Sequence, residues 1–202
     1  MSISMDTKTR AYDMTARGEA ASLTRDAIVS AVIECVTEQR SLGITLAAVA
    51  ERAGVTVKTV LRHFGTRDAM IDAAWAQVHD EVVAERAATP GDLPAALTIL
   101  IAHYEQRGDM MIGLLAEEDV EARARDVCES GRATHRTWVE SVFAEPLPNG
   151  HRQRQRLVDT LVVATDVYSW KLLRRDHGLS VDEVQDRMML MCNGILREGS
   201  PP

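Results

Sequence analysis

Basic side chains gather in one short stretch of this sequence. The stretch from residue 52 to residue 67 contains no aspartate or glutamate, and its basic residues are Arg52, Lys58, Arg62, His63 and Arg67. Lysine and arginine pair with phosphate oxygens, and their clustering on one element is typical of surfaces that bind nucleic acid. Because any short window can be biased in charge, the flanking sequence must indicate whether these cations face a partner.

The overall charge restricts where such binding can occur. The chain carries 23 lysine and arginine residues against 30 aspartate and glutamate residues, which gives a net charge of −7. The first 70 residues hold nine basic and eight acidic side chains, so the excess negative charge lies in the remainder. Since the DNA backbone repels an acidic protein, contact with nucleic acid is expected only in the N-terminal part.

The segment TLAAVAERAGVTVKTVLRHF, residues 45–64, has the pattern of a helix-turn-helix. Thr45 and Thr56 are suitable N-caps for two short helices. Gly54 supplies the positive φ that the turn requires, and Ala50 is small enough to let the helices cross closely. The residues expected to clamp this crossing are Val49, Ala53, Val55 and Val60. An ordinary pair of core helices can show this pattern, but the basic stretch on the second helix favours DNA contact.

Helix-forming residues dominate most of the chain, and no alternation of apolar and polar residues predicts a strand, so we expect an all-α fold. Helices are expected over residues 24–40, 45–53, 56–64, 66–88, 93–106, 109–116, 118–144, 151–176 and 180–197. The apolar face of the first helix is expected to comprise Ile28, Val32, Cys35 and Val36. Residues 1–22 are polar without periodicity and are expected to form a flexible arm. We expect a DNA-binding domain over residues 23–68 and a second domain over residues 69–202.

Other classes of site find little support. Cys35, Cys128 and Cys192 lack the spacing of metal ligands, and their odd number argues against a disulfide framework. No apolar stretch approaches the roughly 20 residues that cross a membrane. The N-terminal residues lack the apolar segment of a secretory leader, so a cytoplasmic protein is expected. We expect no metal, cofactor or catalytic residue.

Residues 25–70 resemble the DNA-binding domain of the TetR family of bacterial regulators. The resemblance depends on residues 44–60 of the helix-turn-helix and on the continuation RHFGTRDAM at residues 62–70, which generic helix-turn-helix proteins lack. The segment YSWKLLRRDHGLSVDEV, residues 168–184, is similar to the last two helices of the family. The resemblance implies an N-terminal three-helix DNA-binding domain followed by a C-terminal helical bundle for ligand binding and dimerisation. It also implies a homodimeric regulator, most simply a repressor released from a palindromic DNA operator by an unidentified small-molecule effector.

The sequence departs from the family at two positions. Leu61 stands where the family usually has an aromatic residue that contacts a phosphate. Arg67 stands where the family usually has lysine, and this exchange keeps the positive charge.

The resemblance and the chemistry of the side chains together assign DNA contacts. The expected DNA-binding residues are Thr45, Thr56, Val57, Lys58, Thr59, Arg62, His63 and Arg67. Thr56 and Lys58 are the expected readers of bases or phosphates, and Val57 is expected to touch a thymine methyl group. Thr45 is expected to place its hydroxyl on a phosphate at a helix N-terminus. Val60, Leu61 and Phe64 are expected to face inward.

Two further sets of residues are expected in the C-terminal part. The candidate effector pocket mixes polar and apolar side chains and comprises His103, Tyr104, Arg107, Met110, Met111, Leu114, His135 and Trp138. The candidate dimer interface follows helical stripes and comprises Leu161, Thr165, Tyr168, Leu172, Val184, Met188, Met191 and Ile195.

Two alternatives remain for the function. An all-helical enzyme is disfavoured, because no HExxH motif, no glycine-rich phosphate loop and no Cys–His constellation occurs. A helical interaction module whose helix-turn-helix no longer binds DNA is favoured only by Leu61. Selection of bound DNA from a random pool would separate such a module from a regulator.

Overall fold

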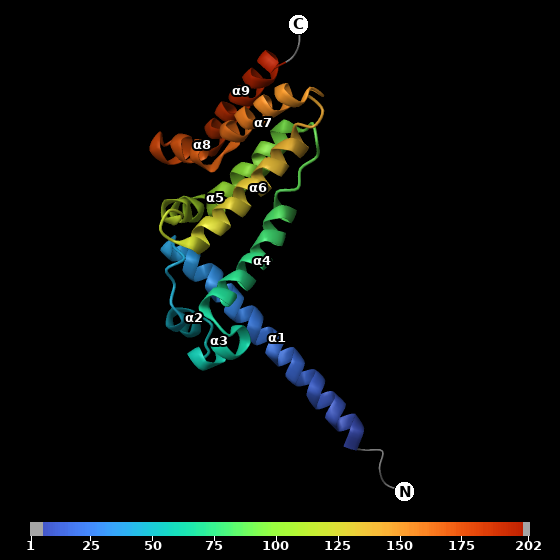
Figure 1. Ribbon diagram of the computed structural model, residues 1–202, viewed down its shortest axis with the longest axis vertical. Coiled ribbons are helices and arrows are strands. Elements are labelled where there is room, and N and C mark those ends of the chain that lie inside the picture. The colour runs from blue at the N-terminus through green and yellow to red at the C-terminus, as the bar shows by residue number, and fades with distance from the viewer. Residues whose placement is uncertain (1–5, 200–202) are drawn as a thin grey trace. The chain divides into compact units, whose positions relative to one another are not determined.

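The computed structural model describes the backbone of residues 6–199 and the side chains of residues 18–198, and every regular element in this range is helical, which confirms the all-α prediction (Figure 1). The elements are α1 (Asp6–Gln39), α2 (Leu46–Arg52), α3 (Val57–Phe64), α4 (Arg67–Glu85), α5 (Leu93–Glu117), α6 (Ala122–Val142), α7 (His151–Thr165), α8 (Val167–Lys171), the π-helical segment η1 (Leu172–Asp176) and α9 (Val181–Gly199). They form two compact units. Unit 1 holds the residues up to 39 and Gly43–Ala76, and unit 2 holds Arg40–Leu42 and the residues from 77 onward.

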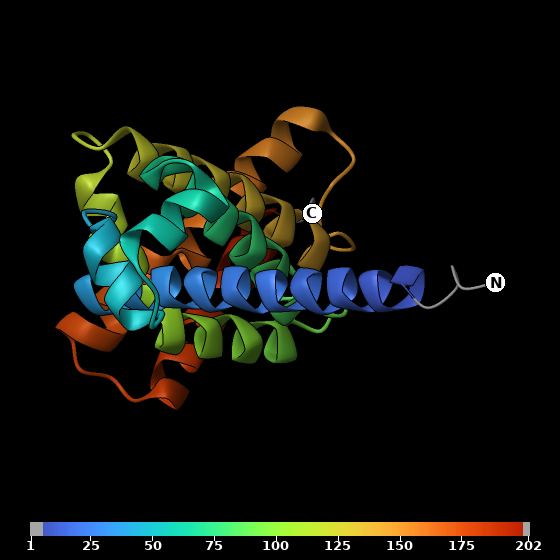
Figure 2. The same ribbon diagram turned by 90° about the horizontal axis from the view of Figure 1, so that it is seen from below.

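The division between the units falls inside α4, whose first residues belong to unit 1. The domain boundary expected after residue 68 lies near the start of the same helix. In unit 1, α2 packs against both α1 and α3, and Figures 1 and 2 show the two short helices lying beside the C-terminal part of α1. The predicted apolar face of α1 is confirmed, because Ile28, Val32, Cys35 and Val36 are each at most 3% exposed.

The first part of α1 corrects the expectation of an arm over residues 1–22. Residues 6–22 continue the helix toward the N-terminus, whereas residues 1–5 lie outside the described residues. Alanine, glutamate, arginine and methionine favour helix, and no proline interrupts this stretch. An apolar periodicity is expected only where a helix buries one face. The side chains of residues 18–22 are all exposed, so the lack of periodicity there does not indicate irregular backbone.

Unit 2 corrects two predicted helix boundaries. Residues 93–117 form the single helix α5, where a break near Gly108 was expected, and α6 begins at Ala122 rather than at residue 118. Gly108 interrupts nothing because it serves packing: a Cβ atom placed there would lie 2.4 Å from Cζ3 of the fully buried Trp170. The glycine therefore lets the indole rest directly on the backbone of α5.

The single helix expected over residues 151–176 is divided in the structure. The chain leaves helical geometry at Asp166, whose carboxylate accepts a hydrogen bond from the Tyr168 amide at 2.9 Å and so caps α8. A residue of α5 also holds the end of α7, because the Tyr104 hydroxyl donates a hydrogen bond to the Thr165 carbonyl at 3.0 Å. These contacts replace the helical hydrogen bonds that a continuous helix would make.

Substitution of Gly108 by alanine is expected to destabilise unit 2. Alanine normally strengthens a helix interior by up to about 1 kcal/mol relative to glycine, but here the new methyl group overlaps Trp170 and overpacking costs about 1–3 kcal/mol. We therefore expect G108A to lower the midpoint of urea unfolding followed by circular dichroism.

Gly131 on α6 provides the matched control, since the nearest atom to its added Cβ would be the Met111 methyl at 3.7 Å. G131A should leave the midpoint unchanged or raise it. Equal behaviour of the two variants would contradict the close packing of Trp170 on α5.

Candidate DNA-binding site

A threonine is the N-cap of each helix of the helix-turn-helix. The Thr45 hydroxyl accepts a hydrogen bond from the Ala48 amide at 3.1 Å, and the Thr56 hydroxyl accepts one from the Thr59 amide at 3.2 Å. Both cap residues have extended backbone angles, as N-caps require. The predicted caps are confirmed. Thr45 and Thr56 are exposed, so their hydroxyls lie at the surface beside the free amides of each helix N-terminus.

The turn between the helices is closed by backbone hydrogen bonds. Gly54 has a φ of 67°, and the next amide, of Val55, donates to the Ala50 carbonyl at 2.9 Å. Residues with a Cβ rarely adopt this backbone conformation, whereas glycine does so freely. Ala50 and Val49 are buried at the crossing. The turn chemistry predicted from the sequence is confirmed, and it fixes the direction in which α3 leaves the turn.

The two sides of α3 have different surroundings. Val60 is fully buried, whereas Val57 is 37% exposed and Leu61 is 39% exposed. Lys58 and Arg62 are also exposed. The expectation that Leu61 faces inward is therefore wrong. At 100° per residue, position 61 lies about 100° around the helix from Val60, between Val57 and Lys58, and so at the edge of the outer side.

The cations of the basic stretch have different partners. Arg52 is neutralised, because its guanidinium donates to Glu38 at 2.6 Å and to Glu34 at 3.3 Å on α1. This pairing lowers the pKa of the Glu38 carboxyl group, chiefly through the hydrogen bond from Arg52. Lys58 and Arg62 form no ion pair with any side chain that the structure describes. Their charges therefore remain free for an external anion.

Arg67 has a structural contact in addition to its predicted role. Its Nε donates to the Ile44 carbonyl at 2.8 Å, and its Nη1 lies 3.4 Å from a carboxylate oxygen of Asp68. The contact joins the start of α4 to the segment before α2. The side chain is 30% exposed, so a phosphate contact by Arg67 stays a prediction.

Thr59 and His63 are half-buried, and the neighbouring Phe64 connects α3 to α1. The Arg25 guanidinium lies over the Phe64 ring, 4.5 Å from its centre, a cation–π contact that holds the end of α3. Arg25 could not be found from the sequence, because nothing in its spacing indicates a partner so far along the chain.

The predicted effector residues lie on α5 and α6 of unit 2. His103, Tyr104, Met110, Leu114, His135 and Trp138 are buried, and Arg107 and Met111 are half-buried. The structure brings several of them together, since the His135 and Trp138 rings stack with centres 5.7 Å apart. The Tyr104 ring lies beside the Trp170 ring at 5.9 Å.

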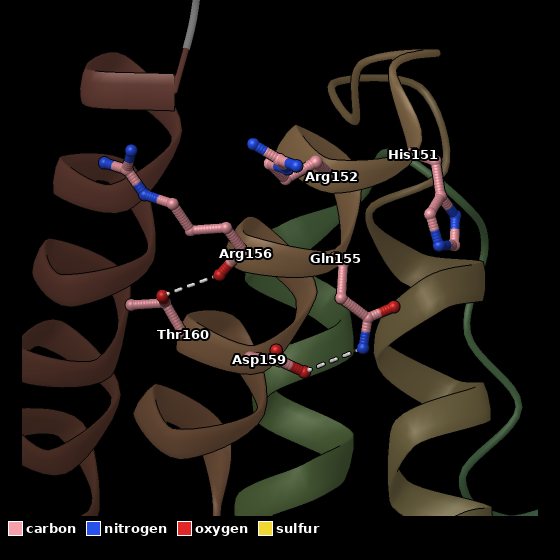
Figure 3. A pocket seen from close by; sticks show the side chains of 6 residues that line it. All are labelled: His151, Arg152, Gln155, Arg156, Asp159 and Thr160. Atoms are coloured by element: carbon pink, nitrogen blue, oxygen red, sulfur yellow. Dashed lines mark hydrogen bonds between the residues drawn. The ribbon is translucent and has the colours of Figure 1, made fainter.

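An open hollow of about 520 Å³ lies elsewhere, along one side of α7 (Figure 3). Its lining is polar and comprises His151, Arg152, Gln155, Arg156, Asp159 and Thr160. None of the residues predicted to bind an effector lines it. All of its lining residues come from a single exposed helix, and two hydrogen bonds of that helix appear among them (Figure 3).

The predicted interface residues divide between core and surface. Leu161, Thr165, Val184 and Met188 are fully buried within their own chain, so the expectation that they face a partner is wrong. Ile195 is half-buried. The exposed large apolar residues of the last helices are Val163, Tyr168, Leu172, Val181, Leu190 and Met191, of which Val163, Val181 and Leu190 were not predicted. The helical stripes correctly identified apolar faces, but the sequence alone does not show which of these faces is buried in the core of the same chain and which is left exposed.

The part of the chain that the structure describes contains no arrangement of residues suited to a metal site, a disulfide or a membrane-spanning helix. No group of three histidine, cysteine or acidic side chains is arranged there to hold a metal ion. Cys35, Cys128 and Cys192 are free and buried. None of the described helices combines the length and the apolar character that crossing a membrane requires.

Known proteins share both the motif and the fold. Residues 36–74 match the family model described as bacterial regulatory proteins, tetR family. The structure is similar to that of a transcriptional regulator from Rhodococcus sp. Rha1, with a TM-score of 0.67 and 18% identity over 88% of this chain and 99% of that chain. It is also similar to a Rhodococcus sp. protein described as a TetR-family transcriptional regulator, with a TM-score of 0.63 and 18% identity over 86% and 98% of the two chains. No curated protein matches the chain in sequence.

The family match begins at Val36 near the end of α1 and ends at Ala74 within α4. It therefore contains the complete helix-turn-helix, whereas Arg25, which contacts the end of α3, lies outside it. The two solved structures support the same fold over most of their length. The motif and the fold thus agree with the resemblance found in the sequence: residues 36–74 match the model of tetR-family bacterial regulatory proteins, and the chain shares the fold of the two solved regulators.

Proposed function

We propose that this chain is a homodimeric repressor that inserts α3 into the major groove of a palindromic operator and leaves it when an effector binds unit 2. The observation that supports DNA reading most directly is the outer side of α3. Lys58 and Arg62 carry unpaired charges there, while Val60 anchors the opposite side. Free cations attract phosphates, and the exposed Val57 and Leu61 beside them suit the methyl groups of thymine.

Dimerisation is proposed through the last helices of unit 2. Val163, Tyr168, Leu172, Leu190 and Met191 leave apolar side chains exposed on α7, α8, η1 and α9. Apolar side chains gathered on neighbouring elements favour association with a second copy. A two-fold dimer would place two copies of α3 on successive major grooves, about 34 Å apart, and so would read a palindrome.

Release by an effector requires that the ligand prefer one conformation over the other. We propose that binding to unit 2 alters the spacing of the two reading helices. The helix α4 belongs to both units, which makes it one covalent route for such a change. The effector residues proposed from the sequence on α5 and α6 remain the candidates for this site.

A second candidate function is a helical interaction module that has lost DNA binding. The observation in its favour is Leu61, an apolar residue that is 39% exposed on the outer side of α3. Such a module would use the same surface for a protein partner. Selection of duplexes from a random pool by the purified chain separates the two functions: an enriched palindrome supports the repressor, and the absence of enrichment supports the module.

Replacement of Lys58 by alanine is expected to weaken DNA binding and its dependence on salt. Each lost phosphate contact lowers the slope of log K against log salt by about 0.9, so K58A should reduce the slope by about 2 for a dimer. Fluorescence anisotropy with the selected duplex at several salt concentrations measures both quantities.

Lys171 on α8 is the matched control, because K171A removes the same charge from unit 2 and breaks only its pair with Asp176. K171A should bind DNA like the unchanged chain. If K58A and K171A give the same salt slope, α3 is not the phosphate-contacting helix.

A charge placed in the proposed interface is expected to separate the protomers. Leu190 is 61% exposed on α9, and L190E would bury a carboxylate on dimerisation without disturbing the core of the protomer. The dimer dissociation constant should rise at least about tenfold in analytical ultracentrifugation. V120E is the control, because Val120 is 87% exposed outside these helices. A monomeric unchanged chain, or unaltered association of L190E, would contradict the proposed interface.

A further inference from the structure

Arg86 is a buried cation in unit 2. It directly follows α4, and only 6% of the residue is exposed. Its Nη2 lies 2.8 Å from His135 Nδ1, its guanidinium lies 5.3 Å from the centre of the Trp138 ring, and its Nε has no hydrogen-bond partner. None of the carboxylates that the structure describes forms an ion pair with it.

A buried guanidinium without an anion is unfavourable. Arginine keeps its proton in proteins, so burial cannot be relieved by neutralising the side chain in the way that a lysine can be neutralised. Burial lowers the pKa of Arg86, which reflects this penalty. Fully buried charges in proteins are nearly always paired. The chain thus holds a positive charge whose partner is not among its own described side chains.

The residues around Arg86 add unpaired donors and acceptors rather than negative charge. His103 is 8% exposed, and its Nδ1 has no hydrogen-bond partner. Burial and the charge of Arg86 lower the pKa values of both His103 and His135 to about 3, so both rings are neutral at pH 7. His135 accepts from Arg86 through Nδ1, which leaves its Nε2 proton to donate to the Thr165 hydroxyl at 3.1 Å. The orientation of His135 is therefore fixed from both sides.

The carboxylate of the preceding residue, Glu85, is engaged elsewhere. Glu85 accepts a hydrogen bond from Arg107 at 3.2 Å, and its other oxygen lies 3.8 Å from His103 Nδ1. Glu85 is exposed at the surface, and the Arg107 side chain is 18% exposed. An anion entering beside His103 would displace the Glu85 carboxylate toward solvent, where it can be hydrated.

We propose that Arg86 is the anchor of an effector site that takes a small organic carboxylate. The guanidinium supplies two parallel N–H donors for the carboxylate, which is the geometry that arginine prefers. His103 supplies a further polar contact, and the Trp138 and Tyr104 rings form apolar walls for the remainder of the ligand. This inference rests on the proposed effector-controlled function and names the chemical class of the effector.

The carboxylate rather than phosphate is favoured by the composition of the site. A doubly charged phosphate needs more donors than one guanidinium and neutral imidazoles provide. The aromatic side chains nearby favour an apolar body, as in an aromatic or medium-chain acid. Phosphate binding is therefore an outcome that contradicts the proposal.

The test measures ligand binding by the full chain without DNA. Benzoate, phenylacetate and octanoate are each titrated to about 10 mM, followed by thermal unfolding and calorimetry, with benzamide, octanamide and inorganic phosphate as comparisons. At least one carboxylate should raise the unfolding temperature and release or absorb heat, while its amide and phosphate should not. No response to any carboxylate, or an equal response to the amides, would overturn the proposal.

The variant R86M separates an anchor from a merely structural residue. Methionine fills a similar volume without charge, so the unliganded variant should unfold at the same temperature as the unchanged chain or higher. Its affinity for the carboxylate should fall at least about tenfold. R152Q on the exposed start of α7 is the control and should bind the carboxylate unchanged. A large drop in the unfolding temperature of R86M, with carboxylate binding retained, would assign Arg86 to the fold alone.

Measurement of duplex affinity with and without the carboxylate, beside this titration, distinguishes failure of the site from failure of the proposed repressor. Suppose that the carboxylate binds and that R86M abolishes this binding, but that adding the carboxylate does not alter the affinity of the unchanged chain for the selected duplex. The anion site then stands, and effector-controlled release is wrong. If the duplex is bound normally and no carboxylate binds, DNA reading stands and the anion site is wrong.

Discussion

The burial of Val60 against the rest of unit 1 determines what α3 presents to its surroundings. Once this side chain is in the core, the helical period turns Lys58 and Arg62 outward. The positive φ at Gly54 and the threonine caps set the direction of the helix before any partner is present. Preorganisation of this kind lowers the entropy that must be lost on binding, so the proposed contact of the short helix with DNA does not require the helix to fold first.

Charge is distributed so that only part of the basic stretch is free. Arg52 is held by two carboxylates of α1, and Arg67 is held by a backbone carbonyl, so these arginines stabilise the domain. Lys58 and Arg62 remain unpaired on the outer side of α3. The same contrast appears in unit 2, where most arginines pair with acidic residues at the surface and Arg86 is buried without one. Unpaired cations thus mark both proposed binding sites, one exposed for a polyanion and one enclosed for a small anion.

The sequence predicted local features well because their causes are local. Thr45, Thr56 and Gly54 act within one turn of the chain, so the caps and the turn were correctly placed. Leu61 was assigned to the wrong side because only the position of Val60 in the core defines the inward direction. Gly108 was taken for a helix break, since its true role depends on Trp170, which is distant in the sequence. Arg86 gave no signal for the same reason: its burial is created by residues of α6 far along the chain.

The central claim is that Lys58 on α3 faces the phosphates of bound DNA, and acetylation footprinting tests it on the unaltered chain. The protein is treated with acetic anhydride with and without the selected duplex, and the modified lysines are quantified by mass spectrometry. We predict that DNA protects the Lys58 amine, while Lys171 in unit 2 is acetylated equally in both samples. Equal acetylation of Lys58 with and without bound DNA would contradict the account.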